Sequence, residues 1–273
     1  MNAEQYFEGV KSYTLLAKKE VGQNFLINAS TALRIVDALE IKPKESVLEI
    51  GFGAGSLTYF LAQTEGKIEG IDIDEAMIAK CTKDFEGKEN LNLHQGNAMK
   101  FDYSFYDKII GNLPYYITSG ILEKVLLGAD NCKKAVFMLQ KEAVERIFAK
   151  PNTKDYGPLN VLLALSGSSK RLFNVPKNDF TPMPHVDSAV FEIVFKEGRS
   201  GLKECYALAN ALFLNRRKTV LNNLKNFLKD GDLAKNTLVL QGISLTKRPE
   251  ELLPEDYYKL SESDTIKGRL KSV

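Results

Sequence analysis

The feature that most constrains the fold is the alternation of short β-rich runs with helical stretches between residues 46 and 196. The β-rich runs are 46–50, 67–73, 91–94, 107–110 and 135–139, and helical stretches such as 56–63, 75–84 and 119–127 lie between them. Alternation at this spacing is typical of βαβ units, which build a mostly parallel sheet with helices on both faces. A last run, 187–195, has no helix after it, and we expect it to pair antiparallel at the end of the sheet. The sequence therefore predicts an α/β fold.

A change of pattern near residue 197 predicts a second domain. Residues 197–201, Glu-Gly-Arg-Ser-Gly, carry two glycines and no hydrophobic periodicity. Beyond them, apolar residues recur at three- and four-residue spacing in 202–214, 219–228 and 249–260, which is the pattern of amphipathic helices. We expect one domain over residues 1–197 and a small all-helical domain over residues 198–273.

Composition excludes several classes of protein. Hydrophobic residues make up 44% of the 273 residues and charged residues 26%, which is ordinary for a soluble globular protein. No apolar run approaches the ~20 residues that span a bilayer, and the first twenty residues lack the apolar core of a secretory signal. Three widely spaced cysteines and two histidines argue against a disulfide framework and a metal site. We expect a cytoplasmic monomer with no metal and no membrane association.

A glycine-rich turn follows the first of these β-rich runs and predicts a nucleoside cofactor site. Glu49-Ile-Gly51-Phe-Gly-Ala-Gly55 opens a helix, and Asp72 ends the second run, 21 residues after Gly51. Glycines allow a tight turn and close approach of the backbone to a ligand, and an acid at this distance can bind both ribose hydroxyls. The spacing is not that of a dinucleotide fingerprint, and Glu49 disfavours a second anion such as a pyrophosphate. A cationic sulfonium nucleoside therefore fits better than NAD.

A second motif, Asn112-Leu-Pro-Tyr115, follows the fourth run, at the sheet edge where α/β proteins bind ligands. An aromatic amine is a poor nucleophile because its lone pair is delocalised into the ring. Two acceptors that bond both of its N–H groups can free that lone pair. The side-chain carbonyl of Asn112 is one candidate, and the backbone carbonyl of Leu113, restricted by the following proline, is the other. Tyr115 offers a ring on which a flipped base can stack, although Asn and Pro are also ordinary turn residues.

Positive charge is concentrated at one point of a chain whose net charge is only +2. Arg216, Arg217 and Lys218 stand together, with Lys225 and Lys229 further on and no acid among them. A local cationic stripe indicates a polyanion partner, while a solvated helix face is the alternative that charge alone leaves open.

These motifs together resemble the ribosomal RNA adenine dimethyltransferase family, over about residues 22–224. Besides the glycine-rich turn and the Asn-Leu-Pro-Tyr loop, the resemblance includes Gly22-Gln-Asn-Phe-Leu26 and Phe180-Thr-Pro-Met-Pro-His-Val-Asp-Ser188. It implies a Rossmann-like class I methyltransferase sheet, S-adenosylmethionine as cofactor and adenine in ribosomal RNA as substrate. Residues implied to bind the cofactor are Asn24, Leu26, Gly51, Asp72, Asn97 and Asn112. Those implied to act in catalysis are Asn112, Tyr115 and Phe180, the last as a stacking partner of the target adenine.

Position 97 departs from the family pattern. The family usually has Asp in a Gly-Asp-Ala motif, where this chain has Gly96-Asn97-Ala98. That acid accepts a hydrogen bond from the adenine amine of the cofactor. The Asn97 amide can still accept that bond but carries no charge.

The basic segment separates branches of this family. Phe213-Leu-Asn-Arg-Arg-Lys218 resembles the members that act on small-subunit rRNA, so Arg216, Arg217 and Lys218 are implied to bind rRNA of the small ribosomal subunit precursor. A large-subunit methyltransferase that confers macrolide resistance is one alternative, and a non-catalytic ribosome-assembly or transcription factor is another. An intact Asn112-Leu-Pro-Tyr115 argues against loss of activity, and the lack of a sequence-reading module disfavours a DNA adenine methyltransferase.

Overall fold

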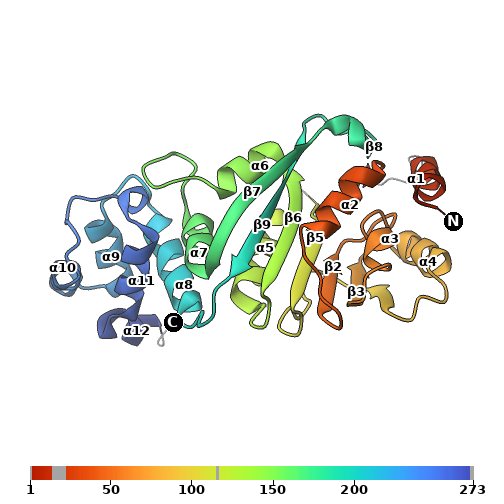
Figure 1. Cartoon of the computed structure of the whole chain (residues 1–273). Helices are drawn as coiled ribbons and strands as arrows, with labels where there is room; N and C mark the ends of the chain where they lie inside the picture. Colours follow the sequence, from red (N-terminus) through yellow and green to blue (C-terminus); the bar gives the residue numbers. More distant parts are fainter. Residues whose placement is uncertain (1, 14–22, 115–116, 271–273) are drawn as a thin grey trace. The chain divides into compact units, whose positions relative to one another are not determined.

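The computed structural model describes residues 2–13, 23–114 and 117–270, and its larger sheet has seven strands (Figure 1). The strand order is β4-β3-β2-β5-β6-β9-β7. The strands are β2 (Ser46–Ile50), β3 (Lys67–Asp72), β4 (Leu91–Gln95), β5 (Lys108–Asn112), β6 (Lys134–Gln140), β7 (Gly167–Val175) and β9 (Ser188–Phe195). β4, β3, β2, β5 and β6 pair in parallel, and β9 runs antiparallel to β6. The predicted α/β class is confirmed.

The central strands are apolar because helices cover both faces of the sheet. All residues of β6 except Gln140 are buried, as are Val47 to Ile50 in β2, which is the pattern of a parallel sheet buried on both sides. The last predicted run is antiparallel as expected, but it does not end the sheet. β7 lies outside it, and the exposed polar positions of β7 are those of an edge strand.

Helices connect the strands and continue beyond them. They are α1 (Ala3–Ser12), α2 (Ala29–Asp37), α3 (Thr58–Leu61), α4 (Glu75–Asp84), α5 (Thr118–Gly128), α6 (Lys141–Ile147), α7 (Pro158–Ser166), α8 (Leu202–Phe213), α9 (Val220–Leu228), α10 (Gly231–Leu240), α11 (Pro254–Glu262) and α12 (Asp264–Leu270). Two-residue strands β1 (Phe25–Leu26) and β8 (Phe180–Thr181) pair antiparallel, and short 3₁₀ turns occupy η3 (Lys177–Asp179) and η4 (Pro249–Glu251). Within the described ranges, no helix has the length and apolar character to cross a membrane.

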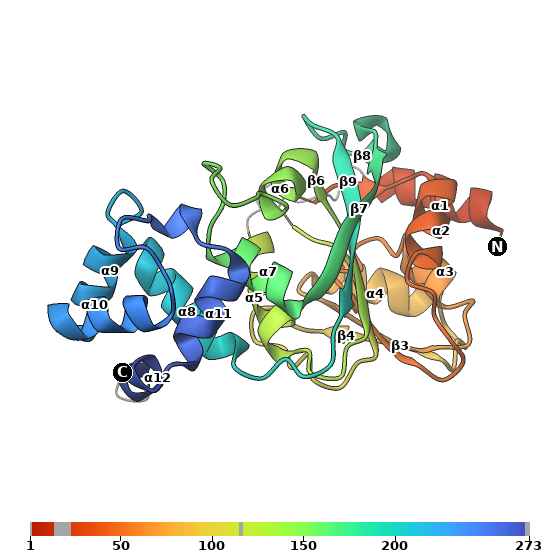
Figure 2. The same cartoon turned by 60° about the vertical axis from the view of Figure 1, so that its left-hand side comes forward.

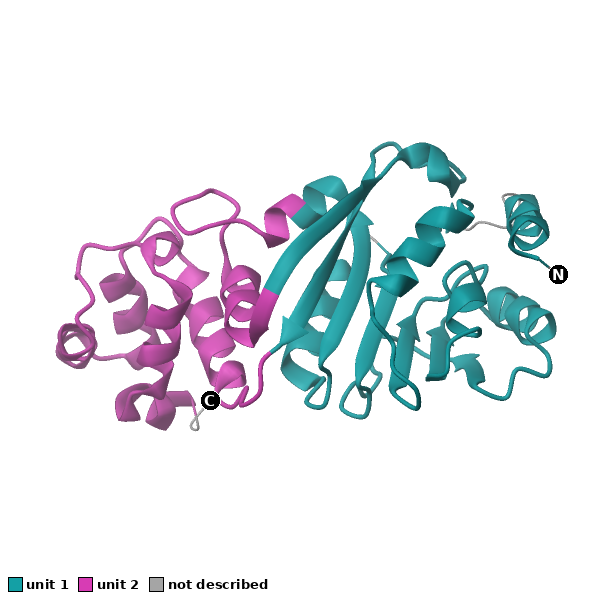
Figure 3. Cartoon of the chain, viewed as in Figure 1, with its two compact units in different colours: residues 1–144, 169–195 teal, residues 145–168, 196–273 magenta. Residues whose placement is uncertain are grey.

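The chain divides into two compact units (Figure 3). Unit 1 comprises Met1–Val144 and Ser169–Phe195, and unit 2 comprises Glu145–Ser168 and Lys196–Val273. The second segment of unit 2 begins at Lys196, close to the predicted domain boundary at residue 197. Unit 2 also contains residues 145–168, which the prediction assigned to the first domain. The reason is packing: Asn160 of α7 donates to the carbonyls of Arg146 and Ile147, and the Tyr156 hydroxyl donates to the Leu252 carbonyl at 3.1 Å.

Candidate active site

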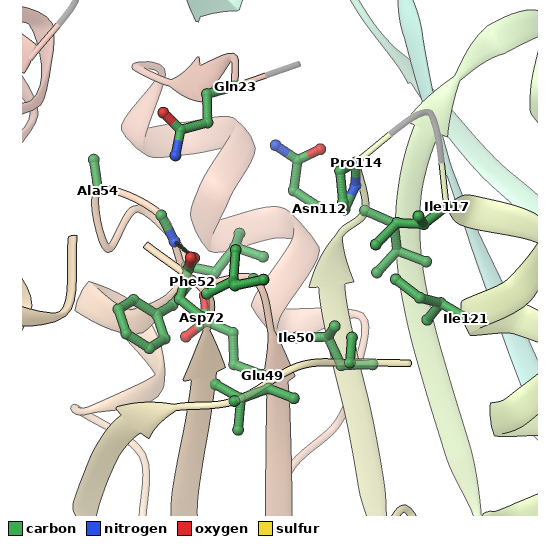
Figure 4. A pocket seen from close by; sticks show the side chains of 18 of the residues that line it. Gln23, Glu49, Ile50, Phe52, Ala54, Asp72, Asn112, Pro114, Ile117 and Ile121 are labelled. Carbon is green, nitrogen blue, oxygen red and sulfur yellow. Dashed lines mark hydrogen bonds between the residues drawn. The ribbon is translucent and has the colours of Figure 1, made fainter. Parts of the chain in front are cut away.

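A cavity of about 330 Å³ lies at the carboxyl ends of the parallel strands in unit 1 (Figure 4). β2 contributes Glu49 and the Gly51 turn, β3 contributes Asp72, and β5 contributes Asn112. The fold places these residues together because parallel strands end at the same edge of the sheet. All six residues expected to bind a cofactor line this cavity: Asn24, Leu26, Gly51, Asp72, Asn97 and Asn112.

The turn after β2 and the end of β3 are joined by Asp72. The turn begins with left-handed backbone at Gly51, where φ is +69°. Gly53 N–H donates to Asp72 Oδ2 at 2.8 Å, and Asp74 N–H donates to Oδ1 at 2.9 Å. Burial raises the pKa of Asp72 and these amide bonds oppose the rise. Each carboxylate oxygen keeps a lone pair for a further donor, so Asp72 can shape the turn and still accept from ribose hydroxyls.

A second acid, Glu49, lies beside Asp72 in the cavity wall. Its side chain is only 1% exposed, and Oε2 accepts a hydrogen bond from the Thr58 hydroxyl at 2.7 Å. Burial raises the pKa of Glu49 to about 8, and the charge of Asp72 adds to the rise. Two carboxyl groups that are costly to ionise when buried are stabilised in their charged form by a bound cation. The electrostatics therefore suit a cationic ligand.

A hydrogen bond from its amide nitrogen orients the side chain of Asn112. Nδ2 donates to the backbone carbonyl of Asn24 at 3.4 Å, and Figure 4 shows the amide oxygen turned the other way, toward Pro114. The next residue is also fixed, because Leu113 N–H donates to the Met138 carbonyl at 3.1 Å. The side-chain oxygen of Asn112 is thus held where an incoming amine can donate to it. Tyr115, the expected stacking partner, lies outside the described residues.

The side-chain oxygen of Asn97 can accept one hydrogen bond in addition to the one that it accepts within the protein. Asn97 is exposed, and its Oδ1 accepts Met99 N–H at 2.9 Å, a local turn that leaves a second lone pair. An aspartate could form the same turn, so the departure at position 97 changes the charge of the cavity wall rather than its backbone.

Phe180, the expected stacking partner of the target adenine, is buried. It is 3% exposed, sits in β8 opposite Leu26 of β1, and belongs to the hydrophobic core. It does not line the cavity. An aromatic ring at this position gains more from burial behind β1 than from exposure at the cavity.

The three residues of the basic segment, Arg216, Arg217 and Lys218, have different surroundings in unit 2. The Arg216 guanidinium contacts Glu250 Oε2 at 3.2 Å and donates to the carbonyls of Thr153 and Lys154. It therefore ties three parts of unit 2 together rather than pointing into solvent. Arg217 and Lys218 are exposed. Lys218 precedes Thr219, the N-cap of α9, and therefore lies outside that helix.

Several cavity residues were not anticipated from the sequence. Apolar walls come from Phe52, which lies within the glycine-rich turn, and from Met99, Ile117 and Ile121, which carry no group that takes part in polar chemistry. Gln23 also lines the cavity and donates to Asp74 Oδ2 at 2.9 Å. Its position beside Asn24 in the Gly22-Gln-Asn-Phe-Leu26 motif is the sequence feature that indicates this place. Glu49, two residues before Gly51 at the end of β2, is also a wall residue, and its position at the strand end is the sequence signal for that place.

Comparison with known proteins gives consistent results. The family model described as ribosomal RNA adenine dimethylase matches residues 14–264. The chain is 36% identical to the ribosomal RNA small subunit methyltransferase A of Laribacter hongkongensis, covering 93% of this chain and 98% of that protein. The protein of the same name from Malacoplasma penetrans is 34% identical, with coverages of 94% and 95%.

Two solved structures extend the similarity to three dimensions. A dimethyladenosine transferase from Plasmodium falciparum matches with a TM-score of 0.71 and 30% identity, covering 85% of this chain and 94% of that one. The 23S rRNA methyltransferase ErmE matches with a TM-score of 0.64 and 24% identity, covering 87% and 98%. At that identity the second match shows a shared fold alone.

Proposed function

The chain belongs to the ribosomal RNA adenine dimethylase family, and from this premise we propose that it methylates the exocyclic amine of adenine in small-subunit ribosomal RNA, giving dimethyladenosine. It is an S-adenosylmethionine-dependent methyltransferase. The observation that carries the assignment is the similarity to small-subunit methyltransferases over more than nine-tenths of the chain. The Asn112 amide beside the cavity supports it, because it supplies the acceptor that this reaction requires.

The residues of the cavity fit S-adenosylmethionine. Asp72 can accept from the ribose hydroxyls, while Glu49 and Asp72 together favour the positive charge of the cofactor. Asn97 is proposed to accept from its adenine amine, and Asn24, Leu26 and Gly51 to contact it along the cavity wall. When bound, the cofactor supplies an electrophilic methyl group on a cationic sulfur.

Asn112 is proposed to activate the target amine. Its oxygen would accept one N–H of the adenine amine, and the Leu113 carbonyl would accept the other, so that the nitrogen lone pair is directed at the methyl group. The bond from Nδ2 to Asn24 fixes this orientation before substrate arrives, which is the condition for an acceptor to act mainly in the transition state. The methylated amine then loses its proton without a dedicated base. Tyr115 is proposed to stack on the base, with Phe180 supporting β1 from the core.

Arg217 and Lys218 are proposed to bind phosphates of the small-subunit precursor, since both are exposed next to a segment that Arg216 holds in place. A large-subunit methyltransferase is the second candidate, and the shared fold with ErmE is compatible with it. The relatives named for the small subunit favour the first candidate. We further propose that the protein acts in the cytoplasm as a monomer and needs no metal.

Mass-spectrometric mapping of rRNA from cells with and without the gene tests this function. Dimethyladenosine should disappear from small-subunit rRNA on deletion and return with the wild-type gene, but not with an Asn112→Ala allele. Loss confined to large-subunit rRNA would support the second candidate. An unchanged modification pattern in both subunits would refute the proposal.

A further inference from the structure

The N-terminal helix α1 is bound to unit 1 by an aromatic cluster. Tyr6 stacks on Tyr59 of α3 with ring centroids 4.7 Å apart, and Phe7 packs against Phe60 at 6.0 Å. These ring contacts place α1 against α3, and the two helices lie close together in the view of Figure 2. The family match begins at residue 14, C-terminal to this helix. The family therefore does not account for α1.

One polar contact joins α1 to the glycine-rich turn. The Tyr6 hydroxyl, in a residue only 4% exposed, donates to the Ala54 carbonyl at 2.9 Å. Lys80 of α4 donates to the same carbonyl at 2.9 Å, and its charge is balanced by Asp84 at 2.6 Å. Two donors occupy both lone pairs of this oxygen, so the peptide after Ala54 is held in a single orientation. Burial raises the pKa of the Tyr6 hydroxyl, which therefore stays a donor.

The local sequence is adapted to this contact. Gly55 has φ of +87°, and a Cβ there would lie 2.4 Å from the Tyr6 oxygen and 3.0 Å from Cys81 Sγ. Only glycine lets α1 and α4 approach so closely. Gly53 and Ala54 of the same turn also line the cavity.

Hydrophobic burial alone would explain a phenylalanine at position 6, but not a buried hydroxyl aimed at the turn. We propose that Tyr6, together with Lys80, is a positioning residue for the cofactor: it fixes the Ala54 peptide, so that the turn presents a preformed backbone surface to S-adenosylmethionine. Preformed sites bind more tightly because less ordering is needed on binding. This inference rests on the proposed function, because it takes the cavity as the site of that cofactor.

Tyr6→Phe tests the inference, because it keeps the stacked ring and removes only the hydroxyl. Loss of one buried hydrogen bond corresponds to about threefold to tenfold weaker binding. We expect the Kd for S-adenosylmethionine and for its demethylated product to rise by that factor in calorimetry. In kinetics, KM for the cofactor should rise, while kcat at saturating cofactor and KM for RNA stay close to wild type. Lys80→Met, which removes the second donor, should shift the same constants in the same direction.

Tyr257→Phe is the matched control. Its hydroxyl also donates from a buried tyrosine to a backbone carbonyl, that of Pro249 at 2.7 Å, but it lies in unit 2. It should lower thermal stability without changing cofactor affinity. Wild-type affinity in Tyr6→Phe, or in Lys80→Met if Tyr6→Phe does not fold, would overturn the inference. Failure of the wild-type protein to bind the cofactor would instead overturn the proposed function.

Discussion

The cofactor cavity and the basic segment 216–218 show two different relations between sequence and role. In the cavity, Gly51, Asp72 and Asn112 are far apart in sequence but meet because each lies at the carboxyl end of a strand of one parallel sheet. In the basic segment, three neighbours in sequence separate: Arg216 is bonded inside unit 2, while Arg217 and Lys218 are exposed. Topology decides where a strand-end residue lies, whereas the role of a surface charge depends on the partners within its reach.

The largest effect is expected at Asn112, the residue at the end of β5 that is proposed to activate the target amine. Asn112→Ala should lower kcat for methyl transfer by at least about 100-fold, the scale for loss of one preorganised transition-state hydrogen bond. Single-turnover assays with labelled cofactor measure the loss. Cofactor affinity should change far less, because the missing interaction acts on the amine in the transition state. Wild-type turnover in this variant would remove Asn112 from the mechanism.

Glu49 should make stability depend on pH. Its pKa in the folded state is about 8 against an ordinary value of 4.5, so the unfolded chain releases a proton that the folded chain retains. The contribution of Glu49 to stability is therefore greatest below about pH 4.5 and falls as pH rises toward 8, by about 1.4 kcal/mol per pH unit.

Urea denaturation between pH 5 and pH 7, without cofactor, measures this contribution against Glu49→Gln. The glutamine variant keeps an acceptor for Thr58 but cannot titrate, so its stability should depend less steeply on pH. Parallel slopes in the two proteins would show that Glu49 is ionised in the folded state.

Arg216→Ala and Arg217→Ala form a matched pair that separates the two roles within the basic segment. Arg216→Ala should lower the free energy of unfolding by about 1–2 kcal/mol, because it breaks contacts to Glu250 and to two carbonyls. Arg217→Ala should change it by less than about 0.5 kcal/mol, as expected at an exposed position. Equal decreases would mean that the two arginines do not differ as their contacts indicate.

The smallest effect concerns salt. Replacing Arg217 and Lys218 by alanine should flatten the log–log dependence of particle affinity on salt by about 0.7–0.9 for each phosphate that the variant no longer binds. Arg216→Ala should leave that slope nearly unchanged. If only Arg216→Ala changed the slope, the assignment of structural and RNA-binding roles would be reversed.

Elements with strong local patterns could be predicted from the sequence. The first run, 46–50, coincides with β2, and the helix expected at 75–84 coincides with α4. Six residues of the cavity wall could be predicted because they belong to sequence motifs, whereas its apolar wall residues Met99, Ile117 and Ile121 could not. β7 could not, since its polar and charged residues give an edge strand no hydrophobic run. The helix expected over 249–260 is divided because Leu252 and Leu253 are extended before Pro254 begins α11.

Contacts between distant residues explain the remaining differences. The bond from Tyr6 to Ala54 spans 48 positions, and those from Arg216 to Thr153 and Lys154 span 63 and 62. No local pattern encodes such partners. The burial of Phe180 likewise follows from the pairing of β8 with β1, two strands too short to show any periodicity.

The choice between the two ribosomal subunits is tested most directly with purified protein, methyl-labelled S-adenosylmethionine and equal amounts of small- and large-subunit precursor particles in one reaction. The methylated nucleosides are identified and mapped by mass spectrometry. We predict dimethyladenosine in the small-subunit RNA, none in the large-subunit RNA, and no transfer by Asn112→Ala. Methylation of the large-subunit RNA alone, or at any atom other than the exocyclic amine of adenine, would contradict the proposed function.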